Sequence, residues 1–137
     1  MKFDPRPYQS SIRDFMLSRE RAAQFVSPGL GKTSATLAAM QDLMADGACR
    51  RALVVAPLRV ARLTWPNEIR KWDCFRGMER NIKFINYESL HKVGDLSKTD
   101  LVVFDELTKA KNPTSKRINS LRPLLRPTMR RWGLTGT

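Results

Sequence analysis

The feature that limits the possible folds most is a pair of uninterrupted apolar runs, Ala52–Ala56 and Leu101–Phe104. A strand with one face in water alternates apolar and polar residues, whereas a strand buried on both faces reads as a continuous apolar run. Such strands belong to parallel sheets, whose crossover connections cover the two faces. We therefore expect an α/β fold with a mostly parallel sheet and helices on both faces.

The rest of the chain alternates between short apolar stretches and segments with helical periodicity, which supports this fold class. Further strands are expected at residues 22–26, 82–85 and 131–134, and helices at residues 7–21, 32–45, 60–72 and 115–125. The proline of Trp65-Pro66 must bend the third helix or split it in two, because it lacks an amide hydrogen. In sheets of this kind, ligands bind at the carboxyl ends of the strands.

Composition restricts the function classes further. The 137 residues fit one domain, and 25 Lys and Arg against 13 Asp and Glu give a net charge of +12, which favours a polyanionic partner such as nucleic acid. No apolar run reaches the roughly 18 residues of a membrane span, and the polar start of the chain is no signal peptide. Cys49 and Cys74 lie far apart and outside any zinc-ligand spacing, so we expect a reduced, cytoplasmic protein.

A glycine-rich segment, Ser27-Pro28-Gly29-Leu30-Gly31-Lys32-Thr33, stands between an expected strand and an expected helix. Its glycines let backbone amides approach phosphate oxygens, Lys32 would neutralise the β- and γ-phosphates, and the Thr33 hydroxyl would hold Mg²⁺. The full consensus has glycine at its first position, where this chain has Val26. The alternative is a turn that only caps the helix. Because strand, loop, Gly-Lys-Thr and helix occur together, nucleotide binding is favoured.

Two carboxylates, Asp105 and Glu106, directly follow the second apolar run. A carboxylate at the carboxyl end of a strand can bind Mg²⁺ beside a phosphate loop. The adjacent glutamate can then polarise the water that attacks a phosphoryl group. Two acids that leave a strand are, on their own, more often a solvated turn. The upstream phosphate loop favours the metal site.

Five segments follow one another in the order of the motifs of helicase superfamily two, the class that contains the DEAD/DEAH-box proteins. They are Arg6-Pro7-Tyr8-Gln9, Gly29-Leu30-Gly31-Lys32-Thr33, Ala56-Pro57-Leu58, Asp105-Glu106 and Gly133-Leu134-Thr135-Gly136-Thr137. Further residues resemble the Swi/Snf-like branch, above all its compact members carried by bacteriophages: Trp65, Glu68, Lys71-Trp72, Asn86-Tyr87-Glu88, Lys111-Asn112-Pro113 and Ser115-Lys116. The resemblance covers essentially the whole chain.

The resemblance implies a RecA-like P-loop NTPase domain over residues 1–137, the ATP-binding lobe of a DNA-dependent ATPase that uses ATP and Mg²⁺. Tyr8 and Gln9 match its adenine-reading motif. The nucleotide-binding positions are Pro28, Gly29, Leu30, Gly31, Lys32, Thr33 and Ser34. Asp105 with Thr33 matches the metal site, and Glu106 with Lys32 matches the catalytic pair.

The resemblance also implies contacts with nucleic acid. Thr135, Gly136 and Thr137 match the motif that couples nucleotide state to the bound strand, and Arg59, Asn86 and Tyr87 fall where relatives hold the DNA backbone. Leu107-Thr108 stands where the family usually has Ala-His. The chain stops at Thr137, where relatives continue into a second RecA-like domain that carries the arginine finger. We therefore expect little or no ATPase activity and no translocation from this chain alone.

Several readings of the partners stay open. Residues 107–137 contain eight basic residues and no acid, which fits sequence-independent binding of single- or double-stranded DNA, a solvated face, or a surface for a second lobe. Two other functions are compatible: an inactive phage module that occupies a host protein or DNA, and one chain of a split helicase. An exposed half-cleft near Leu134 would favour self-association. Trp65 and Trp72 are expected in the core.

Overall fold

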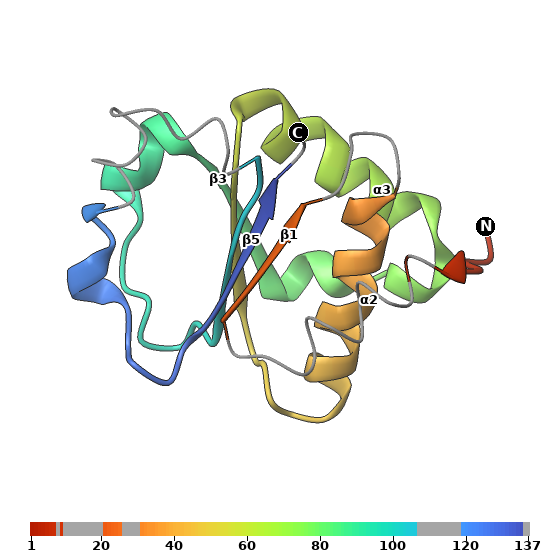
Figure 1. Cartoon of the computed structure of the whole chain (residues 1–137), viewed down its shortest axis with the longest axis horizontal. Helices are drawn as coiled ribbons and strands as arrows, with labels where there is room; N and C mark the ends of the chain where they lie inside the picture. Colours follow the sequence, from red (N-terminus) through yellow and green to blue (C-terminus); the bar gives the residue numbers. More distant parts are fainter. Residues whose placement is uncertain (8, 10–20, 26–30, 107–118, 136–137) are drawn as a thin grey trace.

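The computed structural model describes residues 1–7, 9, 21–25, 31–106 and 119–135. Over these residues the chain forms a five-stranded, all-parallel sheet in the order β1-β5-β4-β2-β3 (Figure 1). Its strands are β1 (Arg21–Phe25), β2 (Ala52–Ala56), β3 (Ile82–Asn86), β4 (Leu101–Phe104) and β5 (Arg130–Thr135). The expected α/β class is confirmed, and a strand lies at each of the five expected places.

The order of the strands decides which face each connection covers. The first two crossovers, from β1 to β2 and from β2 to β3, run in the same direction along the sheet. Because crossovers are right-handed, helices α2 (Lys32–Ala45) and α3 (Trp65–Lys71) lie on one face (Figure 1). The next two crossovers return, so the 3-10 helices η4 (Tyr87–Lys92) and η6 (Arg122–Leu124) cover the other face.

Each face has its own buried cluster, and this explains the uninterrupted apolar runs. Val54 of β2 packs in the cluster under α2 and α3, with Leu37 and Trp65. Its neighbours Leu53 and Val55 pack in the cluster under η4. Since successive strand residues point to opposite faces, a strand with a core on each side has no position for a polar residue.

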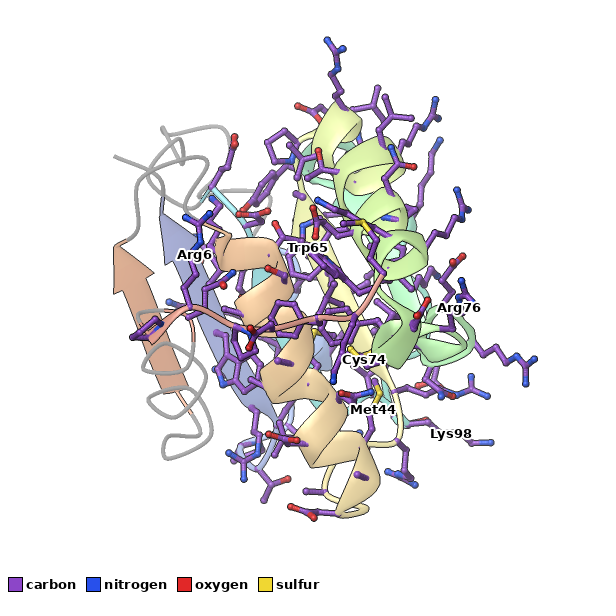
Figure 2. The ribbon with its side chains drawn as sticks, turned by 90° about the vertical axis from the view of Figure 1, so that its right-hand side faces the viewer. Arg6, Met44, Trp65, Cys74, Arg76 and Lys98 are labelled. Carbon is purple, nitrogen blue, oxygen red and sulfur yellow. The ribbon has the colours of Figure 1, made fainter. Side chains whose placement is uncertain are left out.

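The helical segment after β2 is not split at its proline but changes its winding there. A π-helical turn, η1 (Val60–Thr64), leads directly into α3, and the backbone N–H of Trp65 donates to the carbonyl of Val60. Pro66 has no N–H to give to the preceding turn, which allows the wider winding there. Figure 2 shows Trp65 in the interior between α2 and α3, whereas Arg76 and Lys98 extend from the surface.

Three expectations need correction. The helix predicted at residues 115–125 extends too far: residue 119 is helical, but residues 120 and 121 form a turn and residues 122–124 form η6, because Pro123 cannot continue an α-helix. Arg21 belongs to β1 and not to the first predicted helix, of which residues 10–20 lie outside the described part. Leu134 is fully buried, because β5 lies inside the sheet between β1 and β4, so no exposed apolar edge forms there.

Two further observations concern the cysteines and the length of the helices. Both cysteines are free thiols, Cys49 buried and Cys74 exposed, and burial raises the pKa of the Cys49 thiol to about 11. Within the described ranges, no helix has the length and apolar character needed to cross a bilayer.

Candidate nucleotide site

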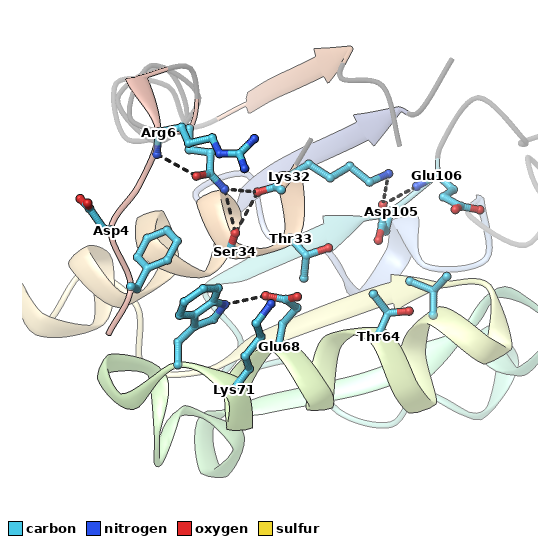
Figure 3. Close-up of a pocket in the computed structure, with 15 residues that line it drawn as sticks. Asp4, Arg6, Lys32, Thr33, Ser34, Thr64, Glu68, Lys71, Asp105 and Glu106 are labelled. Carbon is cyan, nitrogen blue, oxygen red and sulfur yellow. Dashed lines mark hydrogen bonds and ion pairs between the residues drawn. The ribbon is translucent and has the colours of Figure 1, made fainter. Parts of the chain in front are cut away.

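A cleft of about 610 Å³ opens where the carboxyl ends of the strands meet the start of α2, a size typical of small-molecule sites (Figure 3). Four segments that lie far apart in the sequence line it. They contribute Phe3, Asp4, Arg6 and Gln9; Gly31, Lys32, Thr33 and Ser34; Val60, Thr64, Glu68, Lys71 and Trp72; and Asp105 and Glu106. The cleft therefore brings together most of the predicted site residues that the structure describes.

The start of α2 is built to accept an anion. Gly31 adopts a left-handed conformation with φ 76°, and a Cβ there would lie 2.1 Å from the side-chain nitrogen of Gln9, so only glycine fits. No side chain caps the first turn, and no acidic residue lies within it. The free N–H groups and the positive end of the helix dipole are thus available to phosphate oxygens.

The phosphate-loop lysine and the strand-end aspartate meet in the cleft. Lys32 Nζ lies 2.9 Å from Asp105 Oδ1, and the two side chains are 12% and 1% exposed. A charge this deeply buried requires a partner of opposite sign or hydrogen bonds. Lys32 and Asp105 supply that pairing for each other.

Asp105 is held by more than Lys32. Its Oδ1 accepts a hydrogen bond from the backbone N–H of Glu106 at 2.8 Å, and its Oδ2 accepts one from Trp65 Nε1 at 2.9 Å. Its backbone carbonyl accepts a hydrogen bond from the Tyr87 hydroxyl at 2.6 Å. Both the carboxylate and the peptide that follows it are therefore fixed by neighbouring groups.

Glu106 has an unusual backbone conformation for a residue with a side chain. Its φ is 56°, the one positive value among the described residues other than glycine. Such conformations cost of order 1 kcal/mol or more and concentrate at functional sites. The left-handed turn places Glu106 on the wall of the cleft beside Asp105 (Figure 3).

Gln9 joins the start of the chain to the start of α2. Its Oε1 accepts a hydrogen bond from the Arg6 N–H at 2.9 Å, while its Nε2 donates to the Gly31 carbonyl and to Ser34 Oγ, each at 3.0 Å. Ser34 Oγ in turn donates to the Gly31 carbonyl at 3.0 Å. The Gln9 side chain thus forms part of the cleft wall next to the phosphate end.

The described residues fit a magnesium ion shared with a nucleotide. They contain no group of three or more His, Cys, Asp or Glu that would form a metal cage from protein ligands alone. Mg²⁺ usually keeps several waters and is bound by one or two protein oxygens together with phosphates. Thr33 and Asp105 line the same cleft and offer oxygens of this kind.

The predicted nucleic-acid contacts divide into two kinds. Arg59 is exposed, and Asn86 is half-buried with its side-chain amide donating to Glu88 Oε2 at 2.9 Å. Tyr87 is 6% exposed, and its hydroxyl is used by Asp105. Burial, with the nearby charges of Asp105 and Glu106, raises the pKa of the Tyr87 phenol. The geometry therefore favours a structural role for the Tyr87 side chain over a contact with DNA.

Some predicted residues lie outside the described part of the chain: Tyr8, Pro28, Gly29, Leu30, Gly136, Thr137 and the side chain of Thr135. Conversely, sequence reasoning placed Trp65 in the core and gave it no part in the site. A buried indole N–H needs a hydrogen-bond acceptor, and this requirement could have indicated that Trp65 contacts a polar residue of the site. The cleft wall from Thr64, Glu68, Lys71 and Trp72 was also not predicted as part of the site.

The fold is that of a RecA-like α/β lobe, and the resemblance to the Swi/Snf-like branch of helicase superfamily two is confirmed by comparison with solved structures. The SWI2/SNF2 ATPase core domain of Sulfolobus solfataricus matches with a TM-score of 0.81 and 25% identity, over 100% of this chain and 32% of that one. The same core in complex with dsDNA matches with a TM-score of 0.78 and 25% identity, over 100% and 33%.

Two phage proteins are also similar. The UvsW helicase from bacteriophage T4 shares the fold, with a TM-score of 0.81 and 14% identity over 98% of this chain and 53% of that chain. Protein p41 of Acyrthosiphon pisum secondary endosymbiont phage 1 is 32% identical over an alignment 164 positions long, which covers 98% of this chain and 36% of p41. The chain thus spans about a third of the length of p41. No family model matches the chain.

Proposed function

We propose that this chain is the ATP-binding lobe of a DNA-dependent ATPase of helicase superfamily two. The observation that carries the proposal is the meeting of Lys32 and Asp105, 2.9 Å apart, in a cleft of nucleotide size at the carboxyl ends of parallel strands. Glu106 stands beside them on the same wall. This arrangement supports the proposal, because a cation suited to phosphate, a carboxylate suited to a metal ion and a candidate base all line one cleft.

Each of these groups has a defined part in the proposed chemistry. The N–H groups at the start of α2 and the Lys32 ammonium would bind the β- and γ-phosphates, and Lys32 would then exchange Asp105 for phosphate oxygens. Thr33 and Asp105 would hold Mg²⁺, which would neutralise phosphate charge. Glu106 orients and polarises the attacking water. Gln9, with Tyr8, matches the motif that would read the adenine.

We propose DNA as the macromolecular partner, bound through its backbone. The net charge of +12 and the exposed Arg59 supply sequence-independent attraction for phosphates. The structurally similar SWI2/SNF2 core of S. solfataricus is known in complex with dsDNA. Affinity for a random-sequence duplex should fall steeply as salt is raised, and Arg59→Ala should reduce that salt dependence.

Hydrolysis by these 137 residues alone should be slow. In this class an arginine finger outside the lobe contributes about a thousand- to a hundred-thousand-fold to the rate. The proposal therefore separates two properties: nucleotide binding, for which the lobe has the groups, and rapid turnover, which a second lobe completes. Typical helicase turnover by the chain alone would contradict this separation.

Titration with a fluorescent ATP analogue and Mg²⁺ tests the proposal. We expect micromolar binding by the wild type and none by Lys32→Ala, while Lys98→Ala, which removes an exposed lysine, should bind normally. Lys32→Ala leaves Asp105 without its cation, so the double variant Lys32→Met with Asp105→Asn serves as a folded control that lacks both charges. Equal binding by the wild type and both Lys32 variants would overturn the proposal.

A further inference from the structure

The two oxygens of the Asp105 carboxylate have different partners. Oδ1 accepts from the Lys32 ammonium and from the backbone N–H of Glu106, and it lies on the side of the cleft (Figure 3). Oδ2 accepts from Trp65 Nε1 at 2.9 Å in the interior, where Trp65 is 0% and Asp105 1% exposed. Oδ1 thus has one side-chain partner that a nucleotide could draw away, Lys32, whereas the side-chain partner of Oδ2 is fixed in the core.

The fixed partner can make only this one hydrogen bond. An indole has a single N–H donor and no acceptor, and Trp65 is enclosed by the cluster under α2 and α3. Lys32, by contrast, is the group that must turn to the phosphates when a nucleotide binds. The Trp65 hydrogen bond is then the side-chain contact that keeps the Asp105 carboxylate in its orientation.

We propose that Trp65 is a positioning residue, which ties Oδ2 of Asp105 and thereby presents Oδ1 to the magnesium ion of the bound nucleotide. This inference rests on the proposed function. A second contact also fixes Asp105: the hydroxyl of Tyr87, from the cluster on the opposite face of the sheet, donates a hydrogen bond to the Asp105 carbonyl at 2.6 Å. Asp105 is therefore hydrogen-bonded by side chains from both faces of the sheet.

The positioning role predicts an effect on the metal and not on the nucleotide as such. Outer-shell partners of metal ligands typically contribute about 10- to 100-fold to metal affinity. Trp65→Phe keeps an aromatic ring at this position and removes the N–H donor. We expect the gain in nucleotide affinity on adding Mg²⁺ to fall about tenfold, while the affinity measured in EDTA stays at the wild-type value.

Trp132→Phe is the matched control, because Trp132 is also fully buried but comes from β5. We expect it to lower the melting temperature without changing the gain from Mg²⁺. Three results would overturn the inference: an unchanged gain in Trp65→Phe, an equal loss of affinity with and without metal, or the same loss of gain in Trp132→Phe. Absence of any Mg²⁺-dependent nucleotide binding by the wild type would instead overturn the proposed function, and the inference with it.

A second measurement needs no folded Trp65 variant. The chain has three tryptophans, so its indole N–H groups give a small set of NMR resonances. When Mg²⁺ is added to the wild-type nucleotide complex, the Trp65 resonance should move, because the cation draws electron density from the carboxylate that accepts its hydrogen bond. The Trp132 resonance should stay in place. A Trp65 resonance that does not respond to Mg²⁺ would overturn the inference.

Discussion

Two aspartates stand at the two ends of β4 and are held in contrasting ways. Asp100, at the amino end, is 20% exposed and accepts hydrogen bonds from the backbone N–H and the guanidinium of Arg50 and from Arg126. Asp105, at the carboxyl end, is 1% exposed, and Lys32 is its one cationic partner among the described residues. Within this part of the chain the first carboxylate is bound by several donors, and the second pairs with a single lysine on the wall of a cleft.

This difference distinguishes a structural carboxylate from a candidate functional one. Guanidinium groups bind carboxylates through a rigid fork, and the contacts of Asp100 support one another at the amino end of the central strand β4. The single lysine of Asp105 sits in a cleft of about 610 Å³. Electrostatic pairing alone therefore does not mark a site; the exchangeable partner and the adjoining space do.

The largest expected effect comes from removing the cation at the carboxyl end. Lys32→Ala should lower the free energy of unfolding by about 3 kcal/mol, because a buried carboxylate loses its charged partner. Lys32→Met with Asp105→Asn should recover most of that loss, since no uncompensated charge remains. Chemical denaturation of the wild type and both variants checks this, and a single variant as stable as the double one would contradict it.

A smaller effect is expected from the hydroxyl behind Asp105. Tyr87→Phe removes the donor to a buried carbonyl and should cost about 1 kcal/mol of folding free energy. Because that carbonyl precedes Glu106, the variant should also weaken Mg²⁺-dependent nucleotide binding, though less than Trp65→Phe does. Binding titrations in Mg²⁺ and in EDTA, beside a denaturation curve, measure both. Weakened binding of a random DNA duplex with intact nucleotide binding would instead favour a DNA contact for Tyr87.

The smallest effect is expected at the amino end of β4, and it depends on pH. Burial alone would raise the pKa of Asp100, but the hydrogen bonds from Arg50 and the charges of Arg50 and Arg126 outweigh it and lower the pKa. The stability that Asp100 contributes is thus present above its ordinary pKa of about 3.9 and is lost as the pH falls below it.

Asp100→Asn should accordingly melt at a lower temperature than the wild type at pH 7, and the gap should narrow below pH of about 4. Its affinity for Mg²⁺ and nucleotide should equal that of the wild type. Thermal melts across this pH range, with one nucleotide titration at pH 7, test both statements. A constant gap at all pH values would show that the carboxylate charge contributes nothing.

The sequence was sufficient where local chemistry and pattern agree. The doubly buried runs predicted β2 and β4 because no polar residue fits between two cores, and the second predicted helix has the bounds observed for α2, Lys32–Ala45. The meeting of Lys32 and Asp105 was predictable because parallel strands bring their carboxyl ends to one edge.

What the sequence did not predict depends on contacts between distant residues. Trp65 lies at a helical spacing from Trp72, which indicates core packing; the acceptor of its N–H is 40 positions away. The Gln9 amide finds its partners 22 and 25 positions later, at Gly31 and Ser34. Only the assembled fold determines which buried donor faces which acceptor.

The pairing of β1 has a consequence for the order in which the molecule is completed. In the described sheet, β1 hydrogen-bonds to β5 alone, in a register that joins Arg21 to Arg131 and Phe25 to Thr135. On a ribosome, the strand just before the phosphate loop thus stays unpaired until residues 130–135 have emerged. Contacts so distant in sequence form slowly and leave strand edges exposed meanwhile. A nascent chain without β5 would contain its other strands but would leave β1 unpaired. We therefore expect it to bind nucleotide only after β5 has emerged.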